Sequence, residues 1–193
     1  MMAKRKPESD LPRTMAEFDA WHALRPERWE FIAGRPVMMA PASKRPTVVK
    51  TNIARHLGNK LAGKPCRTYA EGVEIKTGVL SAIPDVVVEC GTIDFATPAV
   101  AEPVLIVEVL SPYTEGDDIG RKRQGHCLIQ ALQHYLVVAQ EGRFVTLHTR
   151  TGPASFDETV YQTGVIDLPA LGISISLDEI YEDVTFADSA DDA

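Results

Sequence analysis

The sequence predicts an α/β (α+β) fold in which helices flank a mixed central sheet. Apolar side chains four residues apart mark a long amphipathic helix, and short runs rich in valine and isoleucine mark buried strands. Helical segments also interrupt the strand segments along the chain. Because no internal repeat or low-complexity linker appears, we expect one domain over residues 11–184, between flexible tails at residues 1–10 and 185–193.

A short helix and a hairpin are expected first. Residues 14–17, Thr-Met-Ala-Glu, have the capping-box pattern, and apolar residues follow at helical spacing until Pro26. Residues 29–32 and 37–39 are strand-like, and the Ala-Gly-Arg-Pro segment between them predicts a turn. The domain is therefore expected to begin with a helix followed by two paired strands.

An apolar stripe indicates a second, stronger helix. Its members lie four residues apart, at Val49, Ile53, Leu57 and Leu61. Lys50 lies off this stripe, and Gly63 and Pro65 end the helix. Four strand-like segments follow, at residues 67–71, 73–77, 85–90 and 104–110.

The C-terminal half continues the alternation of helix and strand. A helix is expected over residues 117–134, although Gly120 and Gly125 weaken it. The last segment, at residues 168–181, predicts a short strand and a helical turn. Between them lie strand-like segments at residues 135–139, 144–149 and 156–162.

Bulk composition excludes membrane and secreted classes of protein. A hydrophobic fraction of 45% and a charged fraction of 24% are typical of soluble globular proteins. No apolar run approaches the roughly 18 residues that span a bilayer, and the basic N-terminal segment lacks the apolar stretch of a secretory signal. We therefore expect no membrane partner.

The cysteines and the net charge bear on location and partners. Cys66, Cys90 and Cys127 lie far apart and form no Cys-x-x-Cys pair, and their odd number favours a reducing compartment over a disulfide framework. We therefore expect a cytoplasmic protein. The net charge of −7 and the pI of about 5.2 argue against broad, charge-driven binding of nucleic acid, but they leave room for a local basic groove.

One acidic residue lies inside a strand that is predicted to be buried. Glu108 belongs to the apolar run at residues 104–110, where a bare carboxylate costs several kcal/mol unless it is paired, protonated or bound to a metal. Asp85 follows Pro84 and opens the preceding strand. If the two strands are antiparallel neighbours, the start of one meets the end of the other and the two carboxylates converge.

Two converging carboxylates repel each other unless a cation lies between them. Oxygen ligands without an organised set of histidines or cysteines favour Mg²⁺ or Mn²⁺ over Zn²⁺. Such an ion polarises a phosphoryl oxygen and lowers the pKa of a bound water, and a nearby lysine can stabilise the charge of the transition state. Lys122, which follows Glu108 by fourteen residues on the next expected helix, is the candidate lysine.

Each of these residues also has a simpler interpretation. Asp85 could be a strand-entry residue, and Glu108 could form a structural ion pair with a basic residue at 121–123 or face solvent on an edge strand. Glu30 could face outward from a half-buried strand, and Asp118 could cap a helix. No zinc-like histidine pairing, Gly-x-Ser-x-Gly motif or phosphate-binding glycine loop in the sequence offers another site.

The chain contains three distinctive segments in this order: WEFIAGRPVMMAP at residues 29–41, IPDVVVEC at residues 83–90 and EPVLIVEVLSPYTEGDDIGRK at residues 102–122. Together they resemble the Uma2 family of proposed restriction endonucleases, within the PD-(D/E)xK nuclease superfamily. The resemblance spans most of residues 14–184. It implies a restriction-endonuclease-like mixed central sheet flanked by helices, with a Mg²⁺-dependent phosphodiesterase site.

The resemblance also implies roles for individual residues. Asp85 matches the aspartate of the family's Pro-Asp motif, and Glu108 matches the acidic residue of the (D/E)xK motif. Leu110 occupies the place of that motif's lysine, and Lys122 matches a lysine that takes over from the following helix. Glu30 matches a glutamate of the early hairpin and is expected as an auxiliary metal or water ligand.

The function expected from these residues is that of a metal-dependent DNA endonuclease. Asp85, Glu108 and the backbone carbonyl of Val109 would hold Mg²⁺ or Mn²⁺, a bound water would attack the phosphodiester, and Lys122 would stabilise the transition state. A homodimer would suit cleavage of both strands. Two alternatives stay open: an inactive binding or structural module on the same fold, favoured by the acidic pI and by Leu110, and a hydrolase of small phosphoesters.

Overall fold

The structure, a computed structural model, describes residues 11–39, 43–110 and 117–186. The expected N-terminal tail lies outside the described residues, and so does the expected C-terminal tail from residue 187 onward.

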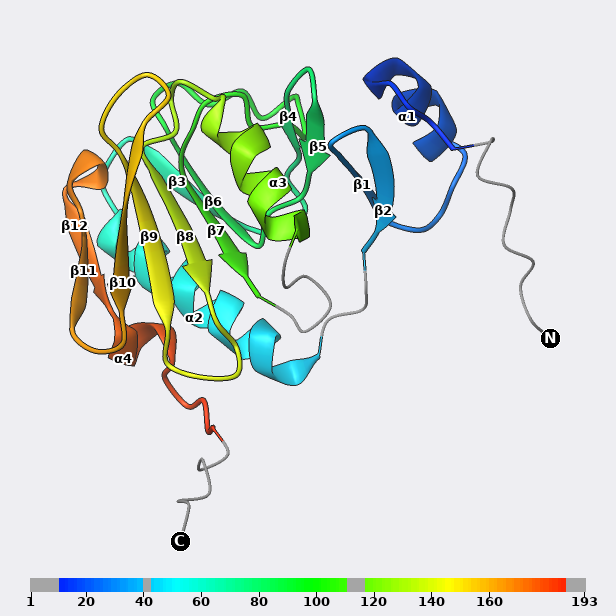
Figure 1. Cartoon of the computed structure of the whole chain (residues 1–193). Coiled ribbons are helices and arrows are strands. Elements are labelled where there is room, and N and C mark those ends of the chain that lie inside the picture. The colour runs from blue at the N-terminus through cyan, green and yellow to red at the C-terminus, as the bar shows by residue number, and fades with distance from the viewer. Residues whose placement is uncertain (1–10, 40–42, 111–116, 187–193) are drawn as a thin grey trace, which may run out of the picture.

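A mixed sheet forms the centre of the fold (Figure 1). In the described ranges it has six strands in the order β10-β9-β8-β7-β6-β3. Their bounds are Phe156–Tyr161 (β10), Val145–Arg150 (β9), His134–Val138 (β8), Pro103–Val109 (β7), Val86–Cys90 (β6) and Cys66–Ala70 (β3). Strands β7 and β8 are parallel and the other neighbours are antiparallel, so the predicted fold class is confirmed.

A smaller sheet lies beside the central one, with its described strands in the order β2-β1-β5-β4. Their bounds are Trp29–Ile32 (β1), Arg35–Met38 (β2), Ile75–Lys76 (β4) and Leu80–Ala82 (β5). Strands β1 and β2 form the predicted hairpin, whose turn places Ala33 and Gly34 at positive φ. The sequence does not predict β5, because three residues are too few to show an alternating pattern.

The first helix, α1 (Met15–His22), packs against the outer part of this smaller sheet. It begins with the predicted capping box, in which the Thr14 side chain accepts from the Glu17 N–H and the Glu17 side chain accepts from the Thr14 N–H. The ring centroid of Phe18 lies 5.2 Å from that of Phe31 in β1. Figure 1 shows α1 and the β1–β2 hairpin at one side of the molecule, far from β9 to β12.

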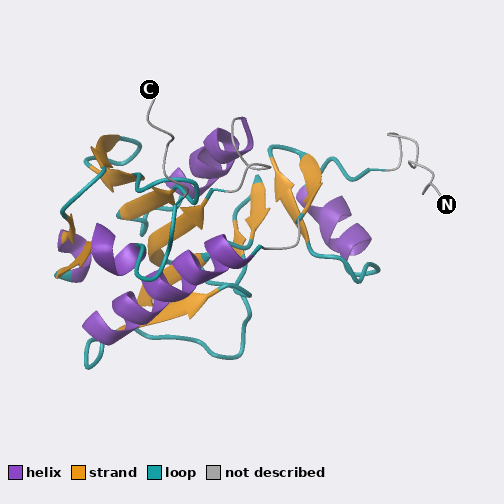
Figure 2. Cartoon of the chain, turned by 90° about the horizontal axis from the view of Figure 1, so that it is seen from below, coloured by secondary structure: helices purple, strands orange, loops and turns teal. Residues whose placement is uncertain are grey.

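Helices cover both faces of the central sheet (Figures 1 and 2). Helix α2 (Lys44–Lys60) buries the predicted apolar stripe against one face, in a core that it shares with Val86, Val88, Leu105 and Val107. The alternate positions Val87 and Ile106 belong to a second core, which includes Tyr135. Helix α3 (Asp117–Cys127) lies on this second side, where the imidazole ring of His126 lies close to the ring of Tyr135.

Helix α3 is shorter than the sequence predicts. It ends at Cys127 and not at residue 134, because His134 already begins β8. The guanidinium of Arg150 donates to the carbonyls of Cys127, Ile129 and Leu132. These carbonyls are therefore satisfied without a further helical turn, and the chain is free to return to the sheet.

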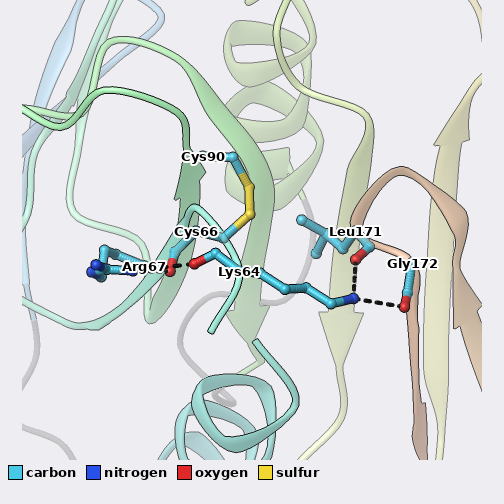
Figure 3. Close-up of a disulfide and its surroundings, with 6 residues drawn as sticks. All are labelled: Lys64, Cys66, Arg67, Cys90, Leu171 and Gly172. Carbon is cyan, nitrogen blue, oxygen red and sulfur yellow. Dashed lines mark hydrogen bonds between the residues drawn. A yellow bond between two sulfur atoms is a disulfide. The ribbon is translucent and has the colours of Figure 1, made fainter. Parts of the chain in front are cut away.

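A disulfide joins Cys66 of β3 to Cys90 of β6 (Figure 3). The two residues are direct partners in the antiparallel register. The expectation that the cysteines form no disulfide is therefore wrong, because strand pairing unites residues that are 24 positions apart. The expected cytoplasmic location loses this support and stays a prediction. Beside the disulfide, Lys64 donates to the carbonyls of Leu171 and Gly172, which ties the C-terminal segment to this end of the sheet (Figure 3).

The C-terminal segment contains the predicted short strand (β12) and helical turn (α4), together with a strand and a 3-10 turn that the sequence does not predict. They are β11 (Val165–Leu168), a 3-10 turn (Pro169–Leu171), β12 (Ile173–Ser176) and α4 (Leu177–Ile180). Ile166, Ile175 and Ile180 belong to the same core as the α2 stripe. Among the helices of the described ranges, none is both long and apolar enough to cross a membrane.

Candidate active site

Two buried carboxylates meet at one end of the β6–β7 pair. Val86 of β6 is the register partner of Val107 of β7, so Asp85, just before Val86, lies beside Glu108, just after Val107. The exposed fraction is 9% for Asp85 and 7% for Glu108. The predicted antiparallel arrangement is confirmed. The alternative in which Glu108 faces solvent on an edge strand is wrong, because β7 lies between β6 and β8.

Asp85 is held from two sides. Its Oδ2 accepts a hydrogen bond of 2.6 Å from the backbone N–H of Val109, and its Oδ1 lies 2.6 Å from Nζ of Lys50. Burial and the charge of Glu108 raise the pKa of Asp85 to about 6, against the opposing effects of Lys50 and the Val109 N–H. Asp85 is therefore a member of a charge cluster as well as a strand-entry residue.

The sequence does not predict Lys50 as part of the site. Lys50 lies on α2 beside the apolar stripe, and its Nζ also lies 3.1 Å from Oε1 of Glu71. Burial lowers the pKa of Lys50, but Asp85 and Glu71 outweigh this effect and the net shift is upward, so the side chain stays charged. A lysine next to a buried valine on a helix carries no local signal for this contact. The contact arises where α2 passes the end of β6.

Lys122 reaches the site from α3. Its Nζ lies 2.8 Å from Oε2 and 2.9 Å from Oε1 of Glu30, and 3.5 Å from Oε1 of Glu108. Burial lowers the pKa of Lys122, but Glu108 and Glu30 outweigh burial and the net shift is upward. Gly125, predicted to weaken the helix, lets α3 approach β5, because a Cβ at this position would lie 3.0 Å from Leu80.

Glu30 brings a third carboxylate from the smaller sheet. Only 4% of Glu30 is exposed, so the alternative in which it faces outward is wrong. Besides its contact with Lys122, Oε1 of Glu30 accepts a 3.0 Å hydrogen bond from the backbone N–H of Ile83. Burial raises the pKa of Glu30, Lys122 opposes this shift, and the charge of Glu108 adds to it. The role of Glu30 as a metal or water ligand stays a prediction.

Two further polar side chains lie behind Glu108, and the sequence assigns neither of them a role. His126 of α3 is fully buried, and its Nε2 lies 3.8 Å from Oε1 of Glu108. Burial, assisted by the charge of Lys122, lowers the pKa of His126 to about 3, so the imidazole is neutral. Within the described residues, neither ring nitrogen has a hydrogen-bond partner, and neither does the hydroxyl of Tyr135, whose ring centroid lies 5.8 Å away. Each unpaired buried polar group costs about 1–3 kcal/mol.

The remaining predicted residues contribute less to the observed cluster. Leu110 donates its backbone N–H to the carbonyl of Val138, and its apolar side chain cannot supply the charge of the motif's lysine. Lys122 brings an ammonium group to the acidic pair from α3 instead. The metal-binding role of the Val109 carbonyl stays a prediction, and the side chain of Asp118 lies outside what the structure describes.

The donor set of this cluster fits a hard divalent cation. Among the described side chains, three buried carboxylates (Asp85, Glu108 and Glu30) face two ammonium groups (Lys50 and Lys122), which leaves an excess of one negative charge when these five groups are ionised; the fourth carboxylate near Lys50, that of Glu71, is exposed and also pairs with Arg28. No group of three His, Cys, Asp or Glu side chains in the described ranges is arranged as a metal site. Mg²⁺ does not need such a group, since one or two carboxylates commonly hold it together with water and substrate phosphates. Asp85 and Glu108 would be those carboxylates.

Two sequence comparisons match most of the chain. The model of the Uma2 family, described as "Putative restriction endonuclease", matches residues 15–178. "Uncharacterized protein slr1290" of Synechocystis sp. is 27% identical over 190 residues, which cover 96% of this chain and 100% of that protein.

A solved structure shares the fold as well. The crystal structure of a "putative nuclease belonging to DUF820" from Anabaena variabilis matches with a TM-score of 0.71 and 16% identity, over 88% of this chain and 97% of the other. The family match spans most of the sequence and includes Asp85, Glu108 and Lys122. The chain therefore belongs to the Uma2 family.

Proposed function

We propose that the protein is a DNA endonuclease that hydrolyses phosphodiester bonds with Mg²⁺ or Mn²⁺. The observation that carries the proposal is the convergence of Asp85 and Glu108 on adjacent strands, between lysines from two different helices. Paired carboxylates suit a hard cation, and the lysines suit the negative charge of a phosphodiester. The description of the Uma2 family supports a substrate of this class.

Each residue of the cluster has a definite task in this proposal. A divalent cation bound here would supply a Lewis acid and a water of lowered pKa. Asp85 and Glu108 would hold the ion, and the N–H of Val109 orients Asp85 through its bond to Oδ2. The ammonium group of Lys122 would stabilise the charge that develops on the phosphoryl oxygens, and Glu30 positions Lys122 through two short contacts.

DNA is the proposed partner because a basic helix runs to the acidic cluster. The sequence of α2, KRPTVVKTNIARHLGNK, holds five lysine or arginine residues and no acidic residue, in a chain with a net charge of −7. Its Arg45 forms an ion pair with Glu141 in which both side chains are exposed. Such pairs contribute little to stability, so a phosphate can replace Glu141 at small cost. We also propose a homodimer, which would present one site to each strand, and a cytoplasmic location.

An inactive binding or structural module on the same fold is the alternative function. Lys50 and Lys122 already neutralise most of the acidic cluster, and Leu110 stands where the motif has its lysine. A hydrolase of small phosphoesters is the third candidate, and turnover of a nucleotide instead of a polymer would identify it.

Two substitutions test the proposal. Asp85→Asn and Glu108→Gln should abolish DNA cleavage in the presence of Mn²⁺ or Mg²⁺, and both should lose the rise in melting temperature that Mn²⁺ gives the parent. Asp178→Asn is the matched control, because Asp178 is exposed and pairs with Arg143. This control should retain both cleavage and the Mn²⁺ effect.

The outcomes separate the candidate functions. If Asp85→Asn or Glu108→Gln cuts DNA at the parent's rate, the active site lies elsewhere. If Mn²⁺ raises the melting temperature of the parent but no DNA is cut, the protein is a binding or structural module.

A further inference from the structure

The buried side chains of His126 and Tyr135 form a polar pair behind Glu108. Both are fully buried, one on α3 and the other on β8, and their ring centroids lie 5.8 Å apart. Both ring nitrogens of His126 and the hydroxyl of Tyr135 lack a hydrogen-bond partner in the part of the chain that the structure describes. Buried polar groups in folded proteins are nearly always paired. A pair of unsatisfied groups beside a charge cluster therefore points to a role other than stability.

Glu108 offers the acceptor that these groups lack. Its Oε1 lies 3.8 Å from Nε2 of His126 and 3.5 Å from Nζ of Lys122. Lys122 and His126 are four residues apart on α3, so they approach the same oxygen from one face of the helix. Both distances exceed an ordinary hydrogen bond of about 2.7–3.2 Å, so a small rotation of the carboxylate can exchange one donor for the other.

We infer that His126 is a positioning residue of the site, whose Nε2–H holds Oε1 of Glu108 when that carboxylate binds a divalent cation. In this arrangement Lys122 is released from Glu108 and faces the phosphodiester. In the same arrangement the hydroxyl of Tyr135, which has no partner among the described residues, would turn to donate to Nδ1 of His126 and so fix the tautomer that carries its proton on Nε2. A hydrogen bond of this kind orients a metal-binding carboxylate from behind. The inference rests on the proposed function.

Mn²⁺ binding by the full chain tests this inference, measured by isothermal titration and by the electron paramagnetic resonance signal of free Mn²⁺. Glu108→Gln should lose Mn²⁺ binding. His126→Phe should weaken Mn²⁺ binding about 10- to 100-fold. His126→Gln retains an N–H donor and should recover most of that loss.

His148→Phe is the matched control. His148 is also buried, and its ring centroid lies 6.1 Å from that of Tyr135, but its Nδ1 lies 3.6 Å from Oε2 of Glu158 and not beside Glu108. The same chemical change at this position should leave Mn²⁺ affinity at the parent's value.

The melting temperature without metal distinguishes a positioning role of His126 from a structural one. If His126 stabilises the fold, its replacement should lower the melting temperature. His126→Phe removes two unpaired polar atoms, so it should melt at or above the parent's temperature while it binds Mn²⁺ more weakly. His126→Leu gives the same test if the phenyl ring of His126→Phe, which is larger than imidazole, disturbs the packing. A lower melting temperature with unchanged Mn²⁺ affinity would show that His126 is structural.

The inference and the proposed function can fail separately. If Glu108→Gln loses Mn²⁺ and His126→Phe binds it like the parent, the role of His126 is wrong and the metal site stands. If Glu108→Gln itself binds Mn²⁺ like the parent, the metal lies elsewhere and both proposals fall.

Discussion

The two ends of β6 are held in place by different kinds of interaction. At one end, Cys90 is covalently bound to Cys66, and Lys64 nearby ties the C-terminal segment to the sheet. At the other end, Asp85 lies buried beside Glu108, with an excess of negative charge in the cluster. The first end stabilises the fold, whereas buried charges contribute little net stability or lower it. This difference supports the proposal that the acidic end serves a binding role, on a strand that is cross-linked at its opposite end.

The largest expected effect comes from removing a cation at the acidic end. Lys122→Met leaves Glu30 and Glu108 buried without this partner, so we expect the free energy of unfolding to fall by about 3–5 kcal/mol. Urea denaturation measures the change. The double variant Lys122→Met with Glu30→Gln should recover part of the loss, because the neutral amide at position 30 no longer needs a cation as its partner. If the Lys122→Met variant is as stable as the parent, the carboxylates of Glu30 and Glu108 do not depend on the charge of Lys122.

Reduction of the disulfide acts on the opposite end. It should lower the free energy of unfolding by about 2–4 kcal/mol, because the cross-link joins residues separated by 24 positions. Urea denaturation with and without reductant measures this loss, and Cys127→Ser controls for the free thiol. Mn²⁺ affinity of the folded protein should stay unchanged, and a loss of affinity on reduction would mean that the two ends are coupled.

The pH dependence of stability should distinguish the acidic end from the rest of the fold. In the folded protein the pKa of Asp85 is about 6, above its ordinary value of 3.8, so the folded state binds this proton more tightly than the unfolded state. The resulting stabilisation is fully present below pH 3.8 and is lost as the pH rises through 6. Its size is on the order of 2–3 kcal/mol in metal-free protein.

The measurement is the difference in unfolding free energy between the parent and Asp85→Asn from pH 3.5 to 7. The variant cannot titrate at this position, so the parent should lose stability relative to it across this window. Equal slopes in the two proteins would contradict the desolvation of Asp85.

The smallest expected effect concerns an exposed pair near the start of α2. Glu141→Gln removes the partner of Arg45 and should change the free energy of unfolding by less than about 1 kcal/mol. DNA affinity at low salt, measured by fluorescence anisotropy, should rise because Arg45 is free to meet a phosphate. Unchanged or weaker binding would exclude this part of α2 from the proposed DNA surface.

Local patterns were sufficient to predict much of the fold and the centre of the site. The stripe of α2 and the β1–β2 hairpin follow from periodicity and turn residues that lie within a few positions of each other. The C-terminal end of α3 does not, because it depends on Arg150, a residue of β9 that binds the carbonyls after Cys127. Periodicity over residues 117–134 carries no information about a partner on another strand.

The convergence of Asp85 and Glu108 was predictable because a carboxylate in an apolar strand needs a partner, and strand order with antiparallel pairing identifies it. Three other features were decided only by the tertiary structure: the contact of Lys50 with Asp85, the position of His126 behind Glu108, and the disulfide of β3 and β6. Each depends on how whole elements are placed or paired across long separations in the chain. The sequence around each of these residues would look the same whether or not the contact forms, so it could not predict the contact.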